Sequence, residues 1–89
     1  MPARKKEAPE PTAREQKIAR GEQAKRLLDD PLFQEAFGTL ETRYAEAWRA
    51  SDPTEANRRE QMYLSLKCLA EVKLELELAV TGGKLAKKQ

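Results

Sequence analysis

The sequence predicts an all-α protein, an antiparallel helical hairpin with a shorter, frayed N-terminal helix, completed by oligomerisation. Of its 89 residues, 39% are hydrophobic and 36% are charged. Chains of this size usually need a disulfide, a metal or a partner subunit to add to a small core. A single cysteine and no histidine exclude an internal disulfide and a conventional zinc site. Association with further copies of the chain is therefore expected.

Prolines and glycines divide the chain into three parts. Residues 1–12 contain three prolines and almost no apolar side chains, which predicts a disordered basic tail. Residues 13–83 are expected to form a single helical domain, and residues 84–89 a basic C-terminal tail. The expected helices cover residues 13–28, 31–50 and 53–80.

The helix boundaries come from local signals. An aspartate followed by a proline opens both longer helices, at Asp30-Pro31 and Asp52-Pro53, because aspartate caps a helix and proline suits its first position. Gly82-Gly83 predicts the end of the last helix, since glycine adopts the left-handed cap conformation. The first helix has few apolar residues and is expected to fray before Gly21.

Apolar residues recur at helical spacing in both longer helices. The middle helix carries one stripe, formed by Phe33, Phe37, Leu40, Tyr44 and Ala47. The last helix is apolar on two sides: one arc contains Met62, Leu66, Leu69, Leu76 and Val80, and the opposite side contains Leu64, Leu74 and Leu78. One neighbouring helix cannot cover both sides.

A two-residue connection at residues 51–52 predicts an antiparallel pair in which facing residue numbers add to about 103. The second arm then projects about 12 Å beyond the first, at 1.5 Å per residue. The overhang is the predicted oligomer interface and consists of Val72, Leu74, Leu76, Leu78 and Val80.

Charge is distributed unevenly, with basic ends on an acidic body. Basic tails can contact phosphate or an acidic protein surface without recognising particular bases. The residues predicted to make such contacts are Arg4, Lys5, Lys6, Lys84, Lys87 and Lys88. The alternative is that these tails only increase solubility.

Aromatic residues and arginines are expected to cluster near the turn between the longer helices. Such clusters anchor protein partners or stack on bases. The predicted contact residues in this cluster are Trp48, Arg58 and Arg59. The alternative is a small core at the end of the hairpin with a polar rim.

No pattern in the chain is typical of an enzyme, because no pair of nucleophile and base is recognisable from the spacing. No cofactor and no metal are expected. No segment has the 18–20 or so continuous apolar residues of a membrane span, so no membrane contact is expected.

Several short stretches resemble a family of short helical proteins of tailed bacteriophages and prophages, encoded near head and DNA-packaging genes. The stretches are residues 30–37, 40–41, 44, 46–48, 59–60 and 81–86. The resemblance implies a virion-assembly or DNA-packaging accessory protein, located in the cytoplasm of a bacterial host or in the virion. Its partners would be further copies of itself, phage structural or packaging proteins, and DNA bound without sequence preference.

Two other functions stay open at this point. A small-terminase-like DNA-binding subunit would form a ring and bind DNA more weakly as salt rises. A small helical inhibitor would instead bind a protein of the host.

Overall fold

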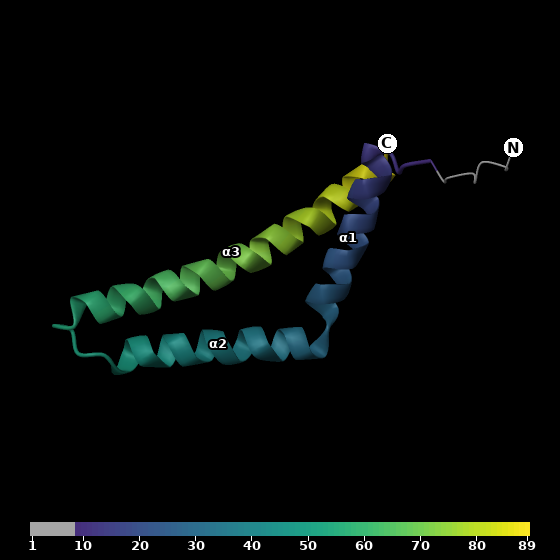
Figure 1. Ribbon diagram of the computed structural model, residues 1–89. Coiled ribbons are helices and arrows are strands. Elements are labelled where there is room, and N and C mark those ends of the chain that lie inside the picture. Colours follow the sequence, from purple (N-terminus) through teal and green to yellow (C-terminus); the bar gives the residue numbers. More distant parts are fainter. Residues whose placement is uncertain (1–8) are drawn as a thin grey trace, which may run out of the picture.

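The computed structural model describes residues 9–89 of the chain, and that part contains three helices and no strand (Figure 1). They are α1 (Ala13–Asp29), α2 (Pro31–Ala50) and α3 (Ala56–Lys87). The longest helix, α3, lies beside α2 in its first half and meets α1 near its C-terminal end (Figure 1). The predicted all-α class is confirmed.

Helix α1 is continuous, so the predicted fraying before Gly21 is wrong. Its first turn carries a capping box: the Thr12 hydroxyl accepts a hydrogen bond from the Glu15 amide at 3.0 Å, and the Glu15 carboxylate accepts one from the Thr12 amide at 2.8 Å. Two amides that a helix start leaves unpaired are thus satisfied. The hydrogen bonds from the backbone and then the side chain of Thr12 lower the pKa of Glu15.

Helix α2 has the bounds that the sequence predicts. The Asp30 carboxylate accepts hydrogen bonds from the amides of Leu32 at 2.8 Å and Phe33 at 3.0 Å. Pro31 occupies the first turn, where its missing amide hydrogen costs nothing. The rings of Phe33 and Phe37 stack one helical turn apart with centroids at 4.6 Å.

Helix α3 begins at Ala56, three residues later than predicted. The Asp52 carboxylate accepts hydrogen bonds from the amide and the hydroxyl of Thr54, at 2.9 and 2.7 Å. The Glu55 amide donates to the Asp52 carbonyl at 2.8 Å. The expected capping groups therefore close a separate turn ahead of the helix, and the connection to α2 is five residues long.

The longer connection also changes how α2 and α3 face each other. Glu41 forms an ion pair with Lys73 at 3.8 Å, and these residue numbers add to 114. Closer to the turn, Arg59 lies over the ring of Trp48. These sums, 107 near the turn and 114 further along, exceed the predicted value of about 103, and the longer connection accounts for about three residues of the difference.

The predicted stop at Gly82-Gly83 is also wrong, because α3 continues through both glycines to Lys87. Residues 84–87 thus belong to the helix and not to a C-terminal tail. No glycine in the described part of the chain has a positive φ. Gly83 instead provides space: a Cβ atom built there would lie 3.1 Å from the Gly21 Cα and from the Lys17 carbonyl oxygen.

Helices α1 and α3 therefore meet backbone to backbone. A Cβ atom on Gly21 would lie 2.9 Å from the Ala79 carbonyl oxygen and 3.0 Å from the Gly83 Cα. Next to this contact, Ala24 and Ala86 are only 4% and 3% exposed. Small side chains let two helices approach closely, and here they form the crossing.

Among the described residues, no large side chain is fully buried. Nine large apolar side chains remain exposed: Leu27, Leu32, Trp48, Tyr63, Leu64, Val72, Leu74, Leu78 and Leu85. The three helices form an elongated body (Figure 1). A single copy thus leaves much of its apolar surface in contact with water.

Candidate functional site

One side of α3 carries four exposed leucines. Leu64, Leu74, Leu78 and Leu85 are 51%, 50%, 54% and 57% exposed. Their spacing of 10, 4 and 7 residues keeps them on one side of a helix. Together with Lys67 and Glu71, which lie between them, we call this surface the outer face.

The predicted oligomer interface is divided between two sides of α3. Leu74 and Leu78 lie on the outer face, and Val72 is 49% exposed on its flank. Leu76 lies beside Leu27 in a hollow between α1 and α3, and Val80 lies beside Ile18 in another. Helix α1 therefore partly covers two of the five residues that the sequence assigns to an interface with a second subunit.

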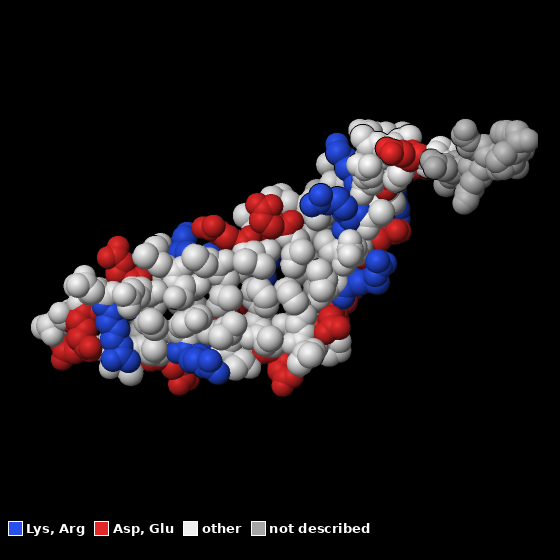
Figure 2. Space-filling model, viewed as in Figure 1, with Lys and Arg blue, Asp and Glu red and all other residues white. Residues whose placement is uncertain are grey.

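Several Lys and Arg side chains lie where α1 meets the C-terminal end of α3, with acidic side chains among them (Figure 2). The residues are Arg14, Lys17, Arg20, Lys84, Lys87 and Lys88, and we call this region the basic end. Arg14 donates hydrogen bonds to the carbonyls of Ala86 at 2.8 Å and Lys87 at 3.4 Å. The Ala86 carbonyl also accepts a hydrogen bond from the Gln89 amide at 3.3 Å, and the Lys87 carbonyl belongs to the last turn, whose oxygens lack partners within the helix.

The structure changes the composition of the predicted phosphate-contacting group. Lys84 and Lys87 lie on a helix, where Lys87 forms an ion pair with Glu22 at 3.5 Å. Arg4, Lys5 and Lys6 lie outside the described residues. The α1 cations at positions 14, 17 and 20 were missed, although their three-residue spacing places them near one another on α1.

A hollow of about 430 Å³ adjoins both surfaces. Lys17 and Arg20 of α1 border it on one side, and Leu78 and Leu85 of α3 on the other. Cationic groups beside apolar walls suit an acidic, amphipathic binding partner.

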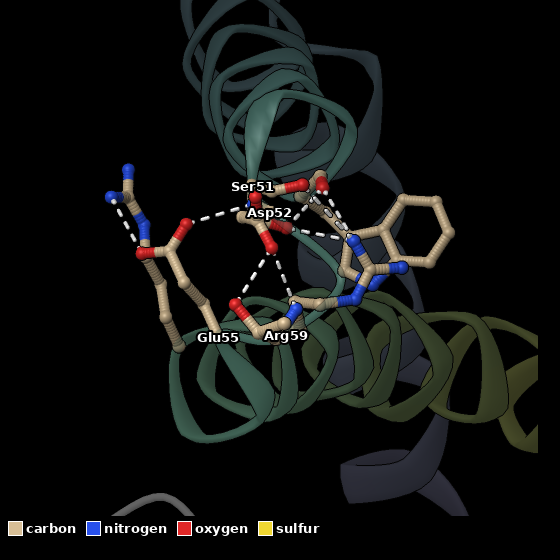
Figure 3. Close-up of polar contacts among 7 residues, drawn as sticks. Ser51, Asp52, Glu55 and Arg59 are labelled. Atoms are coloured by element: carbon tan, nitrogen blue, oxygen red, sulfur yellow. Dashed lines mark hydrogen bonds and ion pairs between the residues drawn. The ribbon is translucent and has the colours of Figure 1, made fainter.

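The turn between α2 and α3 is held by a cluster around Arg59 (Figure 3). The Arg59 guanidinium lies 4.3 Å from the centroid of the Trp48 ring and donates a hydrogen bond to the Ser51 hydroxyl at 2.8 Å. The Ser51 hydroxyl donates to the Trp48 carbonyl at 2.6 Å. Of the predicted contact residues, the structure thus joins Trp48 and Arg59. Arg58 instead forms an ion pair with Glu55 at 3.7 Å.

The hydrogen bonds from the backbone and side chain of Thr54 hold the pKa of Asp52 below its ordinary value. Because the folded pKa is lowered, the stabilisation is present above the ordinary carboxylate pKa. It is lost as the pH falls through the lowered value.

Replacing Arg59 with alanine is expected to lower the free energy of unfolding by about 1–2 kcal/mol, because the cation–π contact and the hydrogen bonds to the buried Ser51 are lost together. Urea denaturation followed by circular dichroism measures this change. Arg58→Ala is the matched control and is expected to change stability by less than about 0.5 kcal/mol, since it removes only an exposed ion pair. Equal losses in the two variants would contradict the assigned role of Arg59.

Within residues 9–89, no three His, Cys, Asp or Glu side chains come together as a metal site would require. None of the helices in this region has a stretch long and apolar enough to cross a membrane. Cys68 is exposed on α3.

The described residues thus present two exposed surfaces, the outer face and the basic end. No model of a known protein family matches the chain, and neither the curated proteins nor the solved structures provide a match.

Proposed function

We propose that this protein is a non-enzymatic assembly protein that associates with itself through the outer face of α3. The observation that carries the proposal is the row of half-exposed leucines on a helix whose other sides already contact α1 and α2. Fully burying an exposed leucine contributes about 1.5–3 kcal/mol, so covering the exposed half of one of these side chains contributes roughly half of that value. The paired α2 and α3 act as the hairpin that supports this face.

The biological setting that we propose is virion assembly or DNA packaging in a tailed bacteriophage or prophage. The resemblance of residues 30–86 to phage proteins supports this setting. The basic end adds a surface that suits phosphate groups or an acidic capsid or portal protein. Self-association would repeat this basic surface in each subunit and increase the avidity of binding.

The test of self-association is the double substitution Leu74→Asp and Leu78→Asp. The wild-type protein is expected to be a dimer or larger at tens of micromolar, and the variant a monomer, because each new carboxylate would have to be buried in the interface. Light scattering coupled to size exclusion measures the mass. Leu32→Asp is the matched control, since Leu32 is an exposed leucine on α2 and its loss is expected to leave the mass unchanged.

A monomeric wild-type protein, or an unchanged mass in the double variant, would contradict the proposal. A loss of helix content in the variant would be detected by circular dichroism. In that case the single substitution Leu74→Gln provides a milder variant, which is also expected to lower the molar mass.

A DNA-binding subunit of the small-terminase kind is the second candidate, and the basic end favours it. From residue 79 to 89 the chain has three lysines and no acidic residue, and α1 adds further cations beside them. Both candidates share self-association, and the strength of DNA binding distinguishes them.

A further inference from the structure

The outer face of α3 has the spacing of a coiled-coil seam. Positions 64, 67, 71, 74, 78, 81 and 85 follow one another at alternating intervals of three and four residues. This is the pattern by which one helix packs lengthwise against another. Four of these seven positions are leucine, and Lys67 and Glu71 occupy adjacent positions near the middle.

The seam is complementary to itself when a second copy runs in the opposite direction. If Lys67 faces Glu71 of the second copy, the same symmetry places Leu64 opposite Leu74. Both pairs then occur twice, as a two-fold axis requires. The axis crosses α3 at the level of Leu69, which itself points to the opposite side.

Other arrangements of the same seam lose this charge pairing. In a parallel pair each charge faces its own copy, so Lys67 meets Lys67 and Glu71 meets Glu71, which is unfavourable. Sliding the antiparallel copy by one heptad either puts Lys67 opposite Leu78 or puts Glu60 opposite Glu71.

The three-helix body leaves room for such a partner. Helix α2 lies on the side of α3 that contains Met62, Leu66 and Lys73, and α1 meets α3 at Gly83 and Ala86. All four leucines of the outer face are at least half exposed, and Leu78 and Leu85 also border the hollow beside α1. A second α3 can therefore lie along the part of the outer face between Leu64 and Leu74 without displacing α1 or α2.

We propose that the outer face binds a second copy of this chain as an antiparallel two-fold pair, with Leu64 against Leu74 and Lys67 against Glu71 of the other copy. This inference rests on the proposed function and specifies the geometry of its self-association. At each end of the overlap, Leu78 lies near the exposed Glu60, so the apolar contact is strongest around the axis.

Mixed disulfide trapping tests the direction and register of the pair. Two proteins are made in a Cys68→Ser background, one with Leu64→Cys and one with Leu74→Cys. Positions 64 and 74 of one chain are about 15 Å apart along the helix, which is beyond the reach of a disulfide. The expected result under mild oxidation is a covalent dimer in the mixture and little or none in either protein alone.

The same experiment identifies the competing arrangements. A parallel pair would link Leu64→Cys to itself and Leu74→Cys to itself, and it would overturn the proposal. A mixture that forms no covalent dimer would also overturn it. The Cys68→Ser background alone controls for association that does not depend on the introduced thiols.

Charge exchange tests the polar pair without cysteine chemistry. Lys67→Glu and Glu71→Lys are each expected to weaken self-association by roughly tenfold or more, since each places like charges together twice. The double variant, with both substitutions, restores opposite charges and is expected to recover the wild-type dissociation constant. Equal dissociation constants for the two single variants and the double variant would overturn the assigned pairing.

These outcomes separate the geometry from the wider function. If light scattering shows dimers but the cysteine mixture forms no covalent dimer, the self-association stands and the antiparallel register is wrong. If the wild-type protein is a monomer, the proposed function and this inference both fail.

Discussion

Replacing Gly83 with alanine is expected to destabilise the protein, whereas the same substitution at the adjacent Gly82 is expected to stabilise it. A Cβ atom on Gly83 would lie 3.1 Å from two backbone atoms of α1, which cannot move aside as a flexible side chain would. A Cβ atom on Gly82 has nothing within 4 Å. The expected loss at Gly83 is about 1–3 kcal/mol of unfolding free energy from overpacking. The expected gain at Gly82 is about 0.5–1 kcal/mol from helix propensity.

Urea denaturation at a single protein concentration measures both changes, since association makes stability depend on concentration. Gly21→Ala is expected to behave like Gly83→Ala, because it meets the Ala79 carbonyl at 2.9 Å. Gly38→Ala, at an open position of α2, is expected to behave like Gly82→Ala. Changes of the same sign and size at Gly82 and Gly83 would refute the close helix crossing.

Removing positive charge from the basic end is expected to reduce binding to DNA strongly. Substituting Lys17, Lys84 and Lys88 with glutamine removes up to three phosphate contacts. The slope of log affinity against log salt concentration is expected to become shallower by about one unit for each contact that is lost. Two duplexes of unrelated sequence are expected to bind alike, because phosphate contacts carry no base information.

A matched variant with Arg43, Arg49 and Arg58 changed to glutamine removes the same charge at a distance from the basic end. It is expected to retain the wild-type salt slope. Equal losses in the two variants would mean that net charge alone governs binding. Strong discrimination between the duplexes would contradict contact through phosphate alone. Undetectable DNA binding at low salt would leave the basic end to an acidic protein partner.

The sequence was most informative where short-range signals decide the structure. Asp30 and Pro31 predict the start of α2 correctly because capping depends on atoms within three residues. The same signal at Asp52 was misleading. There the carboxylate bonds to the amide and hydroxyl of Thr54 and closes a separate turn, so α3 begins later and the register shifts.

The end of α3 could not be predicted from local propensity. Gly83 ends no helix here, because its lack of a side chain serves a contact with Gly21, which is 62 residues earlier in the chain. Long-range packing of this kind has no local signature. The continuity of α1 could have been found, since Thr12 and Glu15 have the spacing of a capping box.

The candidate surfaces were predicted in part. The two-sided distribution of leucines on the last helix was visible in the sequence. Leu76 and Val80 border hollows beside α1. Because the sequence does not indicate where α1 lies, it predicts one interface for these two residues together with Leu74 and Leu78. Likewise, the chain order separates Arg14 from Lys87, and only the crossing of α1 and α3 brings them together.

Self-association through the outer face of α3 is the central claim, and the molar mass of the unmodified protein as a function of concentration tests it most directly. Sedimentation equilibrium over a range from submicromolar to hundreds of micromolar is expected to show a mass that rises from the 10.1 kDa of one chain to about twice that value. A mass that stays at 10.1 kDa across the whole range would contradict it.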